Sequence, residues 1–214
     1  MKRGIFITFE GPDGCGKTSI MNLLKDYYKE NKNIIFTREP GGTIISEKIR
    51  EIILSNDSKE MSDKTEALLY AASRAQHIDQ LIRPNLENGK VVISDRFVLS
   101  SLAYQGGGRA LGVDNVRNIN NFAIGEVKPD MVLFFYVDPL TTLKRKSLSI
   151  NADRLELSGD DFHNRVYDTY MKLLDEMKDE KYLCRIDATL EMKEVFENVK
   201  KVIDEKLEEL VWRW

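Results

Sequence analysis

The amino-acid sequence predicts an α/β fold in which helices cover both faces of a five-stranded parallel sheet. Short apolar runs alternate along the chain with longer segments of helical periodicity. Alternation of this kind joins neighbouring strands through right-handed helical crossovers, so it favours a parallel sheet. In addition, the first apolar run leads into a glycine-rich turn that opens a helical segment, an order typical of doubly wound sheets.

The composition describes a globular protein without a general affinity for nucleic acids. The chain has 214 residues, which suits a single domain spanning 1–214, and its 42% of hydrophobic residues can form a substantial core. Because the net charge is −3, the protein lacks a broad basic field, and we expect no nucleic-acid partner. Any anion that it binds must be held by a local cluster of basic groups.

The number of cysteines and the hydropathy of the sequence indicate the cellular compartment of the protein. The two cysteines, Cys15 and Cys184, lie far apart in the sequence, and two cysteines make neither a disulfide framework nor a zinc site. The apolar run 131–137 is far shorter than a membrane span. We therefore expect a cytoplasmic protein with no membrane partner.

The segment 11–18 carries a specific functional pattern. Its letters, GPDGCGKT, match G-x-x-x-x-G-K-[S/T] between a predicted strand and a predicted helix. Glycines let backbone N–H groups curl around a polyphosphate, and the helix N-terminus adds its positive dipole end. In this pattern Lys17 reaches the β- and γ-phosphates, and the Thr18 hydroxyl ligates Mg²⁺. We interpret the segment as a nucleoside triphosphate site rather than an ordinary turn, formed by Gly11, Pro12, Asp13, Gly14, Cys15, Gly16, Lys17 and Thr18.

The first half of the chain shows clear boundaries between its elements. Apolar residues at helical spacing mark the helices, whereas Asn, Gly and Pro mark the breaks. Ser62 or Asp63 caps the third helix, and Glu66 is placed to complete a capping box on Asp63. The elements expected after the glycine-rich turn are helix 17–30, strand 34–37, polar loop 38–43, a helix carrying Ile45, Ile49, Arg50, Ile52 and Ile53, and helix 64–87.

The second half continues the alternation. Pro139 is placed at the first position of a short helix, where its missing N–H removes no hydrogen bond. The expected elements are strand 90–94, helix 98–105, loop 106–109, helix 114–124, strand 131–138, the short helix up to 146, an irregular polar segment 147–159, helix 160–177, strand 182–187 and helix 191–210. The tail 212–214 has three open interpretations: a packing contact, a dimer contact or a frayed end.

The loops after the first three strands are expected to meet in one cleft, because parallel sheets bind ligands beyond the carboxyl ends of their strands. These loops are 11–18, 38–43 and 95–96. Asp95 ends a buried strand, where it is placed to act near Mg²⁺, and the alternative is that it caps the next helix. We favour the metal role, since Arg96 follows directly and charged pairs gather at functional sites.

Four arginines, Arg38, Arg50, Arg74 and Arg96, fall on elements that face the predicted cleft. Each one alone fits a solvated surface charge. As a set beside a triphosphate loop they indicate a second, phosphorylated substrate, because guanidinium groups bind phosphate with two parallel hydrogen bonds. Tyr70 lies one helical turn from Arg74, so the two can stack a base and bond its edge, although Tyr70 alone fits a core position.

The segment of about 144–158 has the composition of a short lid. It is rich in Ser and Asn and has basic groups at both ends. Lids that close over phosphate exclude water and can bring in a cation to neutralise the transferring charge. The alternative is an irregular surface loop, since the middle of the segment is not basic.

Together these motifs resemble the bacterial thymidylate kinase family, which transfers the γ-phosphoryl group of ATP to dTMP in dTTP biosynthesis. The resemblance runs nearly end to end. It implies a three-layer P-loop kinase fold with a short lid, ATP as co-substrate, Mg²⁺ as cofactor and a homodimer. The matching stretches are FEG at 9–11, TREPGGT at 37–43, AASR at 71–74, DR at 95–96, SSLAYQG at 100–106, KPD at 128–130 and IDA at 186–188.

The resemblance also implies roles for individual residues. Tyr70 stacks on thymine, Arg74 donates to a thymine carbonyl, and Ser101 or Gln105 reads the base edge. Tyr104 crowds the 2′ position, and Asp95 acts on Mg²⁺ through water or phosphate. The implied dTMP-binding residues are Asp13, Arg38, Glu39, Arg50, Tyr70, Arg74, Arg96, Ser101, Tyr104 and Gln105, and the implied catalytic residues are Lys17, Asp95, Arg96 and Arg154.

The sequence departs from the family pattern around the transition-state cation. Gly14 stands where some members have a basic residue, so a basic lid should compensate. Ser147 and Ser149, however, stand where lids of that type place arginines. The remaining candidates are Lys146, Arg154 and Arg145, the last of which we also assign to the ATP site.

Two other functions compete with this interpretation. One is a kinase for another deoxynucleotide or a deoxynucleoside, which the thymine-edge residues argue against. The other is a nucleotide-dependent switch or regulatory ATPase, which needs no acceptor pocket. The arginine set and the stacking pair favour an enzyme with two substrates.

Overall fold

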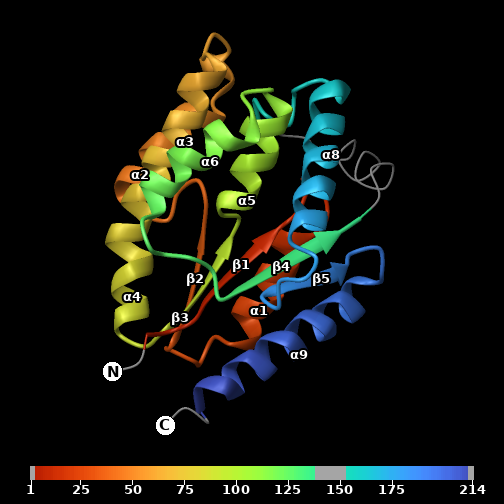
Figure 1. Ribbon diagram of the computed structural model, residues 1–214. Coiled ribbons are helices and arrows are strands. Elements are labelled where there is room, and N and C mark those ends of the chain that lie inside the picture. Colours follow the sequence, from red (N-terminus) through yellow and green to blue (C-terminus); the bar gives the residue numbers. More distant parts are fainter. Residues whose placement is uncertain (1–2, 138–152, 212–214) are drawn as a thin grey trace.

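The computed structural model describes residues 3–137 and 153–211 and contains a five-stranded, all-parallel sheet (Figure 1). The strand order is β2-β3-β1-β4-β5. This confirms the α/β fold class, and it places the strands that carry the three predicted loops next to one another. The strands are β1 (Phe6–Glu10), β2 (Ile34–Arg38), β3 (Val91–Asp95), β4 (Met131–Tyr136) and β5 (Leu183–Asp187).

Helices cover both faces of the sheet (Figure 1). Helices α1 (Lys17–Tyr27) and α9 (Met192–Val211) pack together on one face. The other side carries α2 (Ile44–Leu54), α3 (Asp63–His77), α4 (Arg83–Glu87), α5 (Val98–Ser101), α6 (Val113–Ile124) and α8 (Asp160–Glu176). A short 3₁₀ turn, Asn56–Ser58, follows α2.

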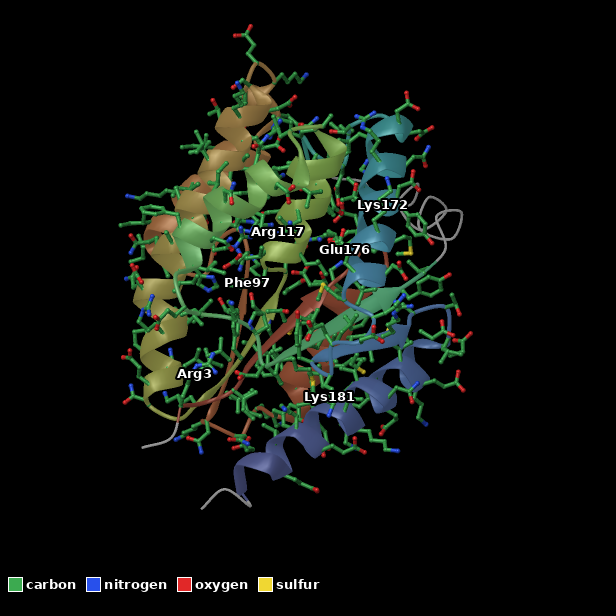
Figure 2. The ribbon with its side chains drawn as sticks, in the orientation of Figure 1. Arg3, Phe97, Arg117, Lys172, Glu176 and Lys181 are labelled. Carbon is green, nitrogen blue, oxygen red and sulfur yellow. The ribbon has the colours of Figure 1, made fainter. Side chains whose placement is uncertain are left out.

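The core is divided by the alternation of side chains along the strands. In β1, Ile7 and Phe9 pack in the cluster that includes residues of α1 and α9, whereas Phe6 points to the opposite cluster. On that second side Phe97 packs edge-on against Phe6, with ring centroids 4.9 Å apart (Figure 2). Helices α6 and α8 are tied near the surface by Arg117 and Glu176, whose charged atoms are 3.7 Å apart.

The long helix expected at 64–87 is interrupted. Helix α3 ends at His77, a π-helical turn (η2, Ile78–Ile82) follows, and α4 completes the segment. The wider turn precedes Pro84, which has no N–H to donate and would collide with a carbonyl of a regular helix. The N-cap is Ser62, whose side chain accepts from the backbone N–H of Thr65. The capping box expected on Asp63 is therefore wrong.

The helix expected at 98–105 and the loop at 106–109 form one continuous element instead. Helix α5 passes into a π-helix (η3) that spans Leu102–Gly108. A Cβ on Gly107 would lie 1.9 Å from the Thr169 hydroxyl, so this glycine lets α8 pack directly against η3. The remaining described elements agree with their expected bounds within a few residues.

Parts of the predicted lid lie outside the described residues. These are the helix expected from Pro139 and most of the segment 144–158, including Arg145, Lys146, Ser147 and Ser149. The tail 212–214 lies outside them as well. Among the described residues no helix is both long enough and apolar enough to cross a membrane.

Candidate active site

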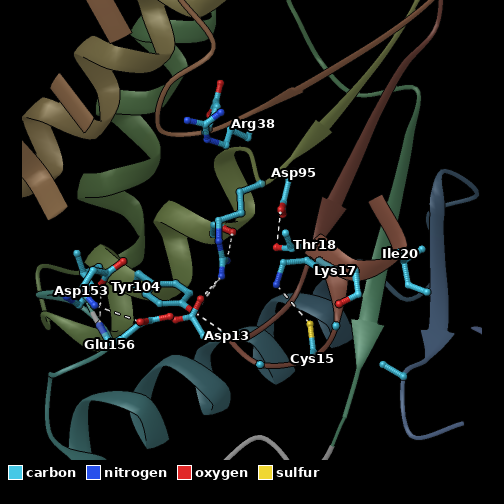
Figure 3. Close-up of a pocket in the computed structure, with 18 of the residues that line it drawn as sticks. Asp13, Cys15, Lys17, Thr18, Ile20, Arg38, Asp95, Tyr104, Asp153 and Glu156 are labelled. Atoms are coloured by element: carbon cyan, nitrogen blue, oxygen red, sulfur yellow. Dashed lines mark hydrogen bonds and ion pairs between the residues drawn. The ribbon is translucent and has the colours of Figure 1, made fainter. Parts of the chain in front are cut away.

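A cleft of about 900 Å³ opens beyond the carboxyl ends of β1, β2 and β3 (Figure 3). The three predicted loops all contribute to its lining, as the strand order requires. Its volume lies within the range of small-molecule sites. The predicted site residues that line it are Asp13, Gly14, Cys15, Gly16, Lys17, Thr18, Arg38, Glu39, Arg50, Tyr70, Arg74, Asp95, Arg96, Ser101, Tyr104 and Gln105.

The phosphate loop (residues 11–18) is held against the sheet at its first glycine. Gly11 has φ +139°, and a Cβ there would lie 2.7 Å from the Phe135 carbonyl oxygen. Any larger residue would therefore push the loop away from β4. At its other end the loop passes directly into α1, which begins at Lys17 and directs its first N–H groups toward the cleft.

The ammonium group of Lys17 lies inside this loop. Its Nζ donates to the carbonyl oxygens of Gly11 at 2.9 Å and Pro12 at 2.8 Å. The third contact is a weak one to the Cys15 sulfur at 3.3 Å (Figure 3). The side chain is buried, so the loop holds a positive charge at a fixed place with little competing water.

Thr18 and Asp95 meet at the end of the cleft next to α1. The Thr18 hydroxyl lies 3.4 Å from Oδ2 of Asp95 (Figure 3). The other carboxylate oxygen, Oδ1, is buried and has no hydrogen-bond partner in the described part of the chain. Asp95 does not cap the next helix, because the N-cap of α5 is Phe97.

This pair of side chains fits Mg²⁺. Mg²⁺ prefers oxygen ligands and usually binds one or two protein side chains together with substrate phosphates and water. A hydroxyl and a carboxylate with an unpartnered oxygen meet that description. Within residues 3–137 and 153–211 there is no group of three or more His, Cys, Asp or Glu side chains that could hold a metal by itself, so phosphate oxygens would have to complete the shell.

Arg96 is fixed by several contacts at the centre of the cleft. Its φ of +71° is rare for a residue with a side chain, and such strain is concentrated at functional sites. The guanidinium donates to the Gly11 carbonyl at 3.1 Å and to the Ser100 hydroxyl at 2.9 Å. It also pairs with Asp13 and lies over the Tyr104 ring, 5.0 Å from its centroid.

The buried carboxylate of Glu10 holds two residues next to Arg96 in place. Ser100 donates to Oε2 of Glu10 at 2.5 Å, and the backbone N–H of Phe97 donates to Oε1 at 2.9 Å. Burial raises the pKa of Glu10, and the Ser100 hydrogen bond opposes that rise. Glu10 thus anchors Phe97, which follows Arg96 in the sequence, and Ser100, which Arg96 contacts. The position of Glu10 at the end of β1 did not reveal this role.

Arg74 is almost completely engaged by the protein. Its guanidinium donates to Glu39 at 2.6 Å, to the Ser101 hydroxyl at 3.0 Å, to the Asn120 side chain and to the Phe97 carbonyl at 3.1 Å. A guanidinium has five N–H groups, so these contacts leave one N–H, on Nη2, among the described residues. Arg74 also lines the cleft, where a ligand could supply a partner for this N–H.

Glu39 links Arg74 to a buried histidine. Its second oxygen lies 2.9 Å from Nδ1 of His77, and the other ring nitrogen contacts the Thr37 hydroxyl at 2.7 Å. Burial works to raise the pKa of Glu39, but the Arg74 charge and the His77 contact outweigh it and hold the pKa below its usual value. No local motif around His77 indicates this role.

The other two cleft arginines are less constrained. Arg38 is half exposed and pairs with Glu47 at 2.8 Å. Arg50 donates to the Pro40 carbonyl at 2.9 Å. Burial and the neighbouring Arg38 charge lower the pKa of Arg50. These two side chains, together with Tyr70, form the wall of the cleft opposite the phosphate loop.

Arg154 is not brought to the phosphate loop. Its Nη2 is 2.6 Å from a carboxylate oxygen of Glu66, and its Nε donates to the Ile53 carbonyl at 2.9 Å. Its neighbours Asp153, Leu155 and Glu156 line the cleft, whereas the side chain of Arg154 points to α3 and α2 instead.

Comparisons with known proteins show the family of this chain. A family model described as thymidylate kinase matches residues 9–199. The chain belongs to the thymidylate kinase family. It is 56% identical to the thymidylate kinase of Finegoldia magna over 200 residues, covering 93% of this chain and 97% of that protein. It is 46% identical to the thymidylate kinase of Clostridium novyi over 203 residues, covering 94% and 98%.

The fold is shared with a solved thymidylate kinase. The crystal structure of the enzyme from Ehrlichia chaffeensis superposes with a TM-score of 0.71 at 29% identity, covering 94% of this chain and 99% of that one. The family resemblance seen in the sequence is therefore confirmed.

One part of this thymidylate kinase cleft was missed from the sequence. The segment 188–192, which follows β5 and leads into α9, lines the cleft beside the phosphate loop. It includes Leu190 and Met192, which are exposed apolar side chains. Apart from Ala188, which ends the IDA stretch, its residues carry no charge cluster or motif, so the rule that sites lie at the carboxyl ends of strands was the main signal that could have indicated it.

Proposed function

We propose that this protein transfers the γ-phosphoryl group of ATP to dTMP, yielding ADP and dTDP. The observation that supports this most directly is the position of Arg96. It contacts the phosphate loop through Gly11 and Asp13 while its guanidinium lies in the cleft with the arginine set. Two anion sites that share one arginine suit two phosphorylated substrates placed end to end.

The reaction needs no protein nucleophile. An oxygen of the dTMP phosphate forms a bond to the γ-phosphorus as the bond to the β–γ bridging oxygen breaks, and ADP leaves with that electron pair. A phosphate oxygen is already anionic near neutral pH, so no general base is required. The protein contributes positioning and charge neutralisation.

Lys17 and the backbone N–H groups of the phosphate loop hold the donor phosphates. On ATP binding, a phosphate oxygen replaces the Cys15 sulfur, which is the weakest of the three ammonium contacts. The contacts with the carbonyls of Gly11 and Pro12 keep the ammonium group in a fixed position while this exchange occurs.

We propose that Thr18 and Asp95 hold Mg²⁺, with Asp95 acting directly or through water. Held by these residues, Mg²⁺ would offset negative charge on the donor phosphates. The unpartnered Oδ1 of Asp95 supports this assignment.

The opposite wall of the cleft receives dTMP. Arg96, Arg38 and Arg50 bind its phosphate, and Tyr70 stacks on the base. The single remaining N–H of Arg74 donates to a thymine carbonyl, and Ser101 or Gln105 reads the rest of the edge. Tyr104, whose hydroxyl donates to Asp13 at 2.7 Å, is held rigidly where it crowds a 2′ hydroxyl.

A cation from the lid completes the neutralisation of the transferring group. Arg145 and Lys146 lie outside the described residues and stay candidates. For Arg154 to act, it would have to leave both Glu66 and the Ile53 carbonyl. Its described contacts favour a supporting role for Arg154.

We also propose that the protein is a cytoplasmic homodimer. Helices α2, α3 and α6 pack side by side and carry large exposed apolar side chains, namely Ile44, Ile45, Ile52, Leu68 and Phe122. Both cysteines are free thiols, which suits a reducing compartment. Sedimentation of the purified protein tests the dimer.

The proposed activity is tested by coupling ADP formation to a spectroscopic readout with dTMP, deoxythymidine or no acceptor. A switch or regulatory ATPase would hydrolyse ATP without an acceptor, and a deoxynucleoside kinase would prefer deoxythymidine.

A further inference from the structure

A buried carboxylate next to the cleft ties three distant segments together. Glu66, on α3, is completely buried. Its carboxylate accepts from Nε2 of Gln105 at 2.9 Å, and it pairs with Arg154 at 2.6 Å and with Arg109 at 3.0 Å. These three partners are all N–H donors, so the Glu66 carboxylate acts as a hydrogen-bond acceptor here.

This contact decides which way the Gln105 amide faces. The two ends of a glutamine amide have nearly the same shape and are distinguished by their hydrogen bonds. Because Glu66 acts as an acceptor toward its partners, the NH₂ end of Gln105 faces it. The oxygen, Oε1, must then face the other way.

That oxygen lacks a partner. Oε1 of Gln105 is one of three buried side-chain atoms without a hydrogen bond in the described residues, and Gln105 lines the cleft. A buried acceptor without a donor destabilises the free protein. A ligand that supplies an N–H at this point therefore forms a hydrogen bond that the free protein lacks.

We infer that Glu66 is a specificity-determining positioning residue, which fixes the Gln105 amide so that an acceptor oxygen meets the nucleobase. This inference rests on the proposed function. Thymine presents an N–H at N3 beside the acceptor O4. Oε1 of Gln105 complements the first and the remaining N–H of Arg74 complements the second.

The same arrangement rejects cytosine. At the corresponding positions cytosine presents an acceptor at N3 and a donor at N4. Oε1 would then face a lone pair, and the Arg74 N–H would face an amino group. Glu66 prevents the amide from turning to relieve the first mismatch, so discrimination against dCMP depends on a residue that does not touch the base.

The arginines keep Glu66 itself in place. Arg109 also contacts Asp63 at 3.5 Å and lies over the Phe162 ring, 4.5 Å from its centroid. Arg154 is held by the Ile53 carbonyl. With both cations anchored, the carboxylate has little freedom to rotate away from Gln105.

The test compares kcat/KM for dTMP, dUMP and dCMP in the wild-type chain and in Glu66→Gln. A glutamine at 66 can offer an N–H, so Gln105 becomes free to turn its NH₂ group toward the base. The dTMP/dCMP ratio should fall at least tenfold, as expected when a paired polar contact is lost. The dTMP/dUMP ratio should stay within about twofold, because uracil has the same edge as thymine.

Two further measurements separate this role from a merely structural one. Glu66→Asp keeps an acceptor-only group and should retain a dTMP/dCMP ratio close to wild type even where its melting temperature is lower. In the wild-type protein, the side-chain NH₂ of Gln105 should exchange with solvent more slowly than that of the exposed Gln80, measured by NMR with and without dTMP. The NMR comparison needs no variant at 66, so it holds even where Glu66→Gln fails to fold.

Different results of these measurements lead to different conclusions. An equal loss on all three acceptors, with an unchanged dTMP/dCMP ratio, or a Gln105 amide that exchanges as fast as Gln80, overturns the inference. If dCMP turnover is too slow to measure, its inhibition constant against dTMP replaces the ratio with a comparison of binding, and Glu66→Gln should then lower that inhibition constant. A wild-type protein that does not phosphorylate dTMP refutes the proposed function instead.

Discussion

Arg96 and Asp13 form an ion pair that joins the end of β3 to the phosphate loop. The same guanidinium donates to the Gly11 carbonyl, so the loop that holds the donor nucleotide also sets the position of a group assigned to the acceptor. In the proposed reaction, these contacts between the loops of neighbouring strands, β1 and β3, would set the relative placement of the two phosphates. An in-line transfer needs such fixed placement.

Arg96→Lys should lower kcat/KM for dTMP by about 100-fold, since a lysine cannot hold Gly11, Ser100 and Asp13 while also binding phosphate through two parallel bonds. The KM for ATP should change little. Steady-state kinetics with each substrate varied in turn measure both effects. Arg83→Lys, at a half-exposed arginine on α4 outside the cleft lining, serves as the matched control and should change neither parameter. An Arg96→Lys enzyme within twofold of wild type would remove Arg96 from the acceptor site.

Lys17→Ala should lower kcat by at least 100-fold, which is about 2.7 kcal/mol of transition-state stabilisation. The fold should persist, because the ammonium contacts are confined to its own loop. Lys25→Ala, an exposed change on the same helix, controls for altered helix propensity. Far-UV circular dichroism shows whether the variant is folded, and steady-state kinetics measure its kcat. Wild-type turnover in a folded Lys17→Ala enzyme would exclude the phosphate loop from the reaction.

Glu39→Gln should lower the free energy of unfolding by about 3–5 kcal/mol at pH 7, because it leaves the buried Arg74 charge without its carboxylate. The pKa of Glu39 is lowered in the folded state, so the stability from its charge is present above about pH 4.5 and is lost as the pH falls through the folded-state pKa. The difference between wild type and variant should therefore shrink below that pH.

Urea unfolding at several pH values measures this difference. Glu197→Gln, which removes an exposed carboxylate from an ion pair with Lys200, should cost less than about 1 kcal/mol at every pH. A Glu39→Gln penalty that is small at pH 7, or that grows on acidification, would contradict the assigned direction of the pKa.

Arg154→Ala should mainly lower the melting temperature and raise the KM for dTMP, because its guanidinium is bound to Glu66 and the Ile53 carbonyl. Turnover should fall less than about tenfold, far less than for Lys17→Ala. Steady-state kinetics distinguish the two roles. If turnover instead fell about 100-fold while the KM stayed unchanged, Arg154 would be identified as the lid cation, because that pattern marks a contact made only in the transition state.

The parts of the site that could be predicted share one property: they rest on local sequence or on strand order. The phosphate loop has a fixed spacing, and the parallel sheet brings Arg38 and Asp95 to the same edge as that loop. Tyr70 and Arg74 share a helix face because of helical periodicity alone.

The parts that could not be predicted depend on contacts between remote segments. Glu66 was expected to cap its own helix, yet its partners lie 39 to 88 residues further along the chain. The glycines at 106–108 suggested a loop, whereas Gly107 and Gly108 permit close packing of η3 against α8, and Gly106 permits close packing against Val113 of α6. Neither the spacing of residues nor the composition of the sequence indicates these contacts, because they form only when the helices pack together.

In the proposed reaction the acceptor is a phosphorylated thymidine. Initial rates of ADP formation with ATP and dTMP, deoxythymidine or no acceptor test it most directly. Because three arginines are assigned to the acceptor phosphate, kcat/KM for dTMP should exceed that for deoxythymidine by at least about 100-fold, with little hydrolysis when no acceptor is present. Equal or faster turnover of deoxythymidine, or a rate of ATP hydrolysis that does not respond to dTMP, would contradict the account.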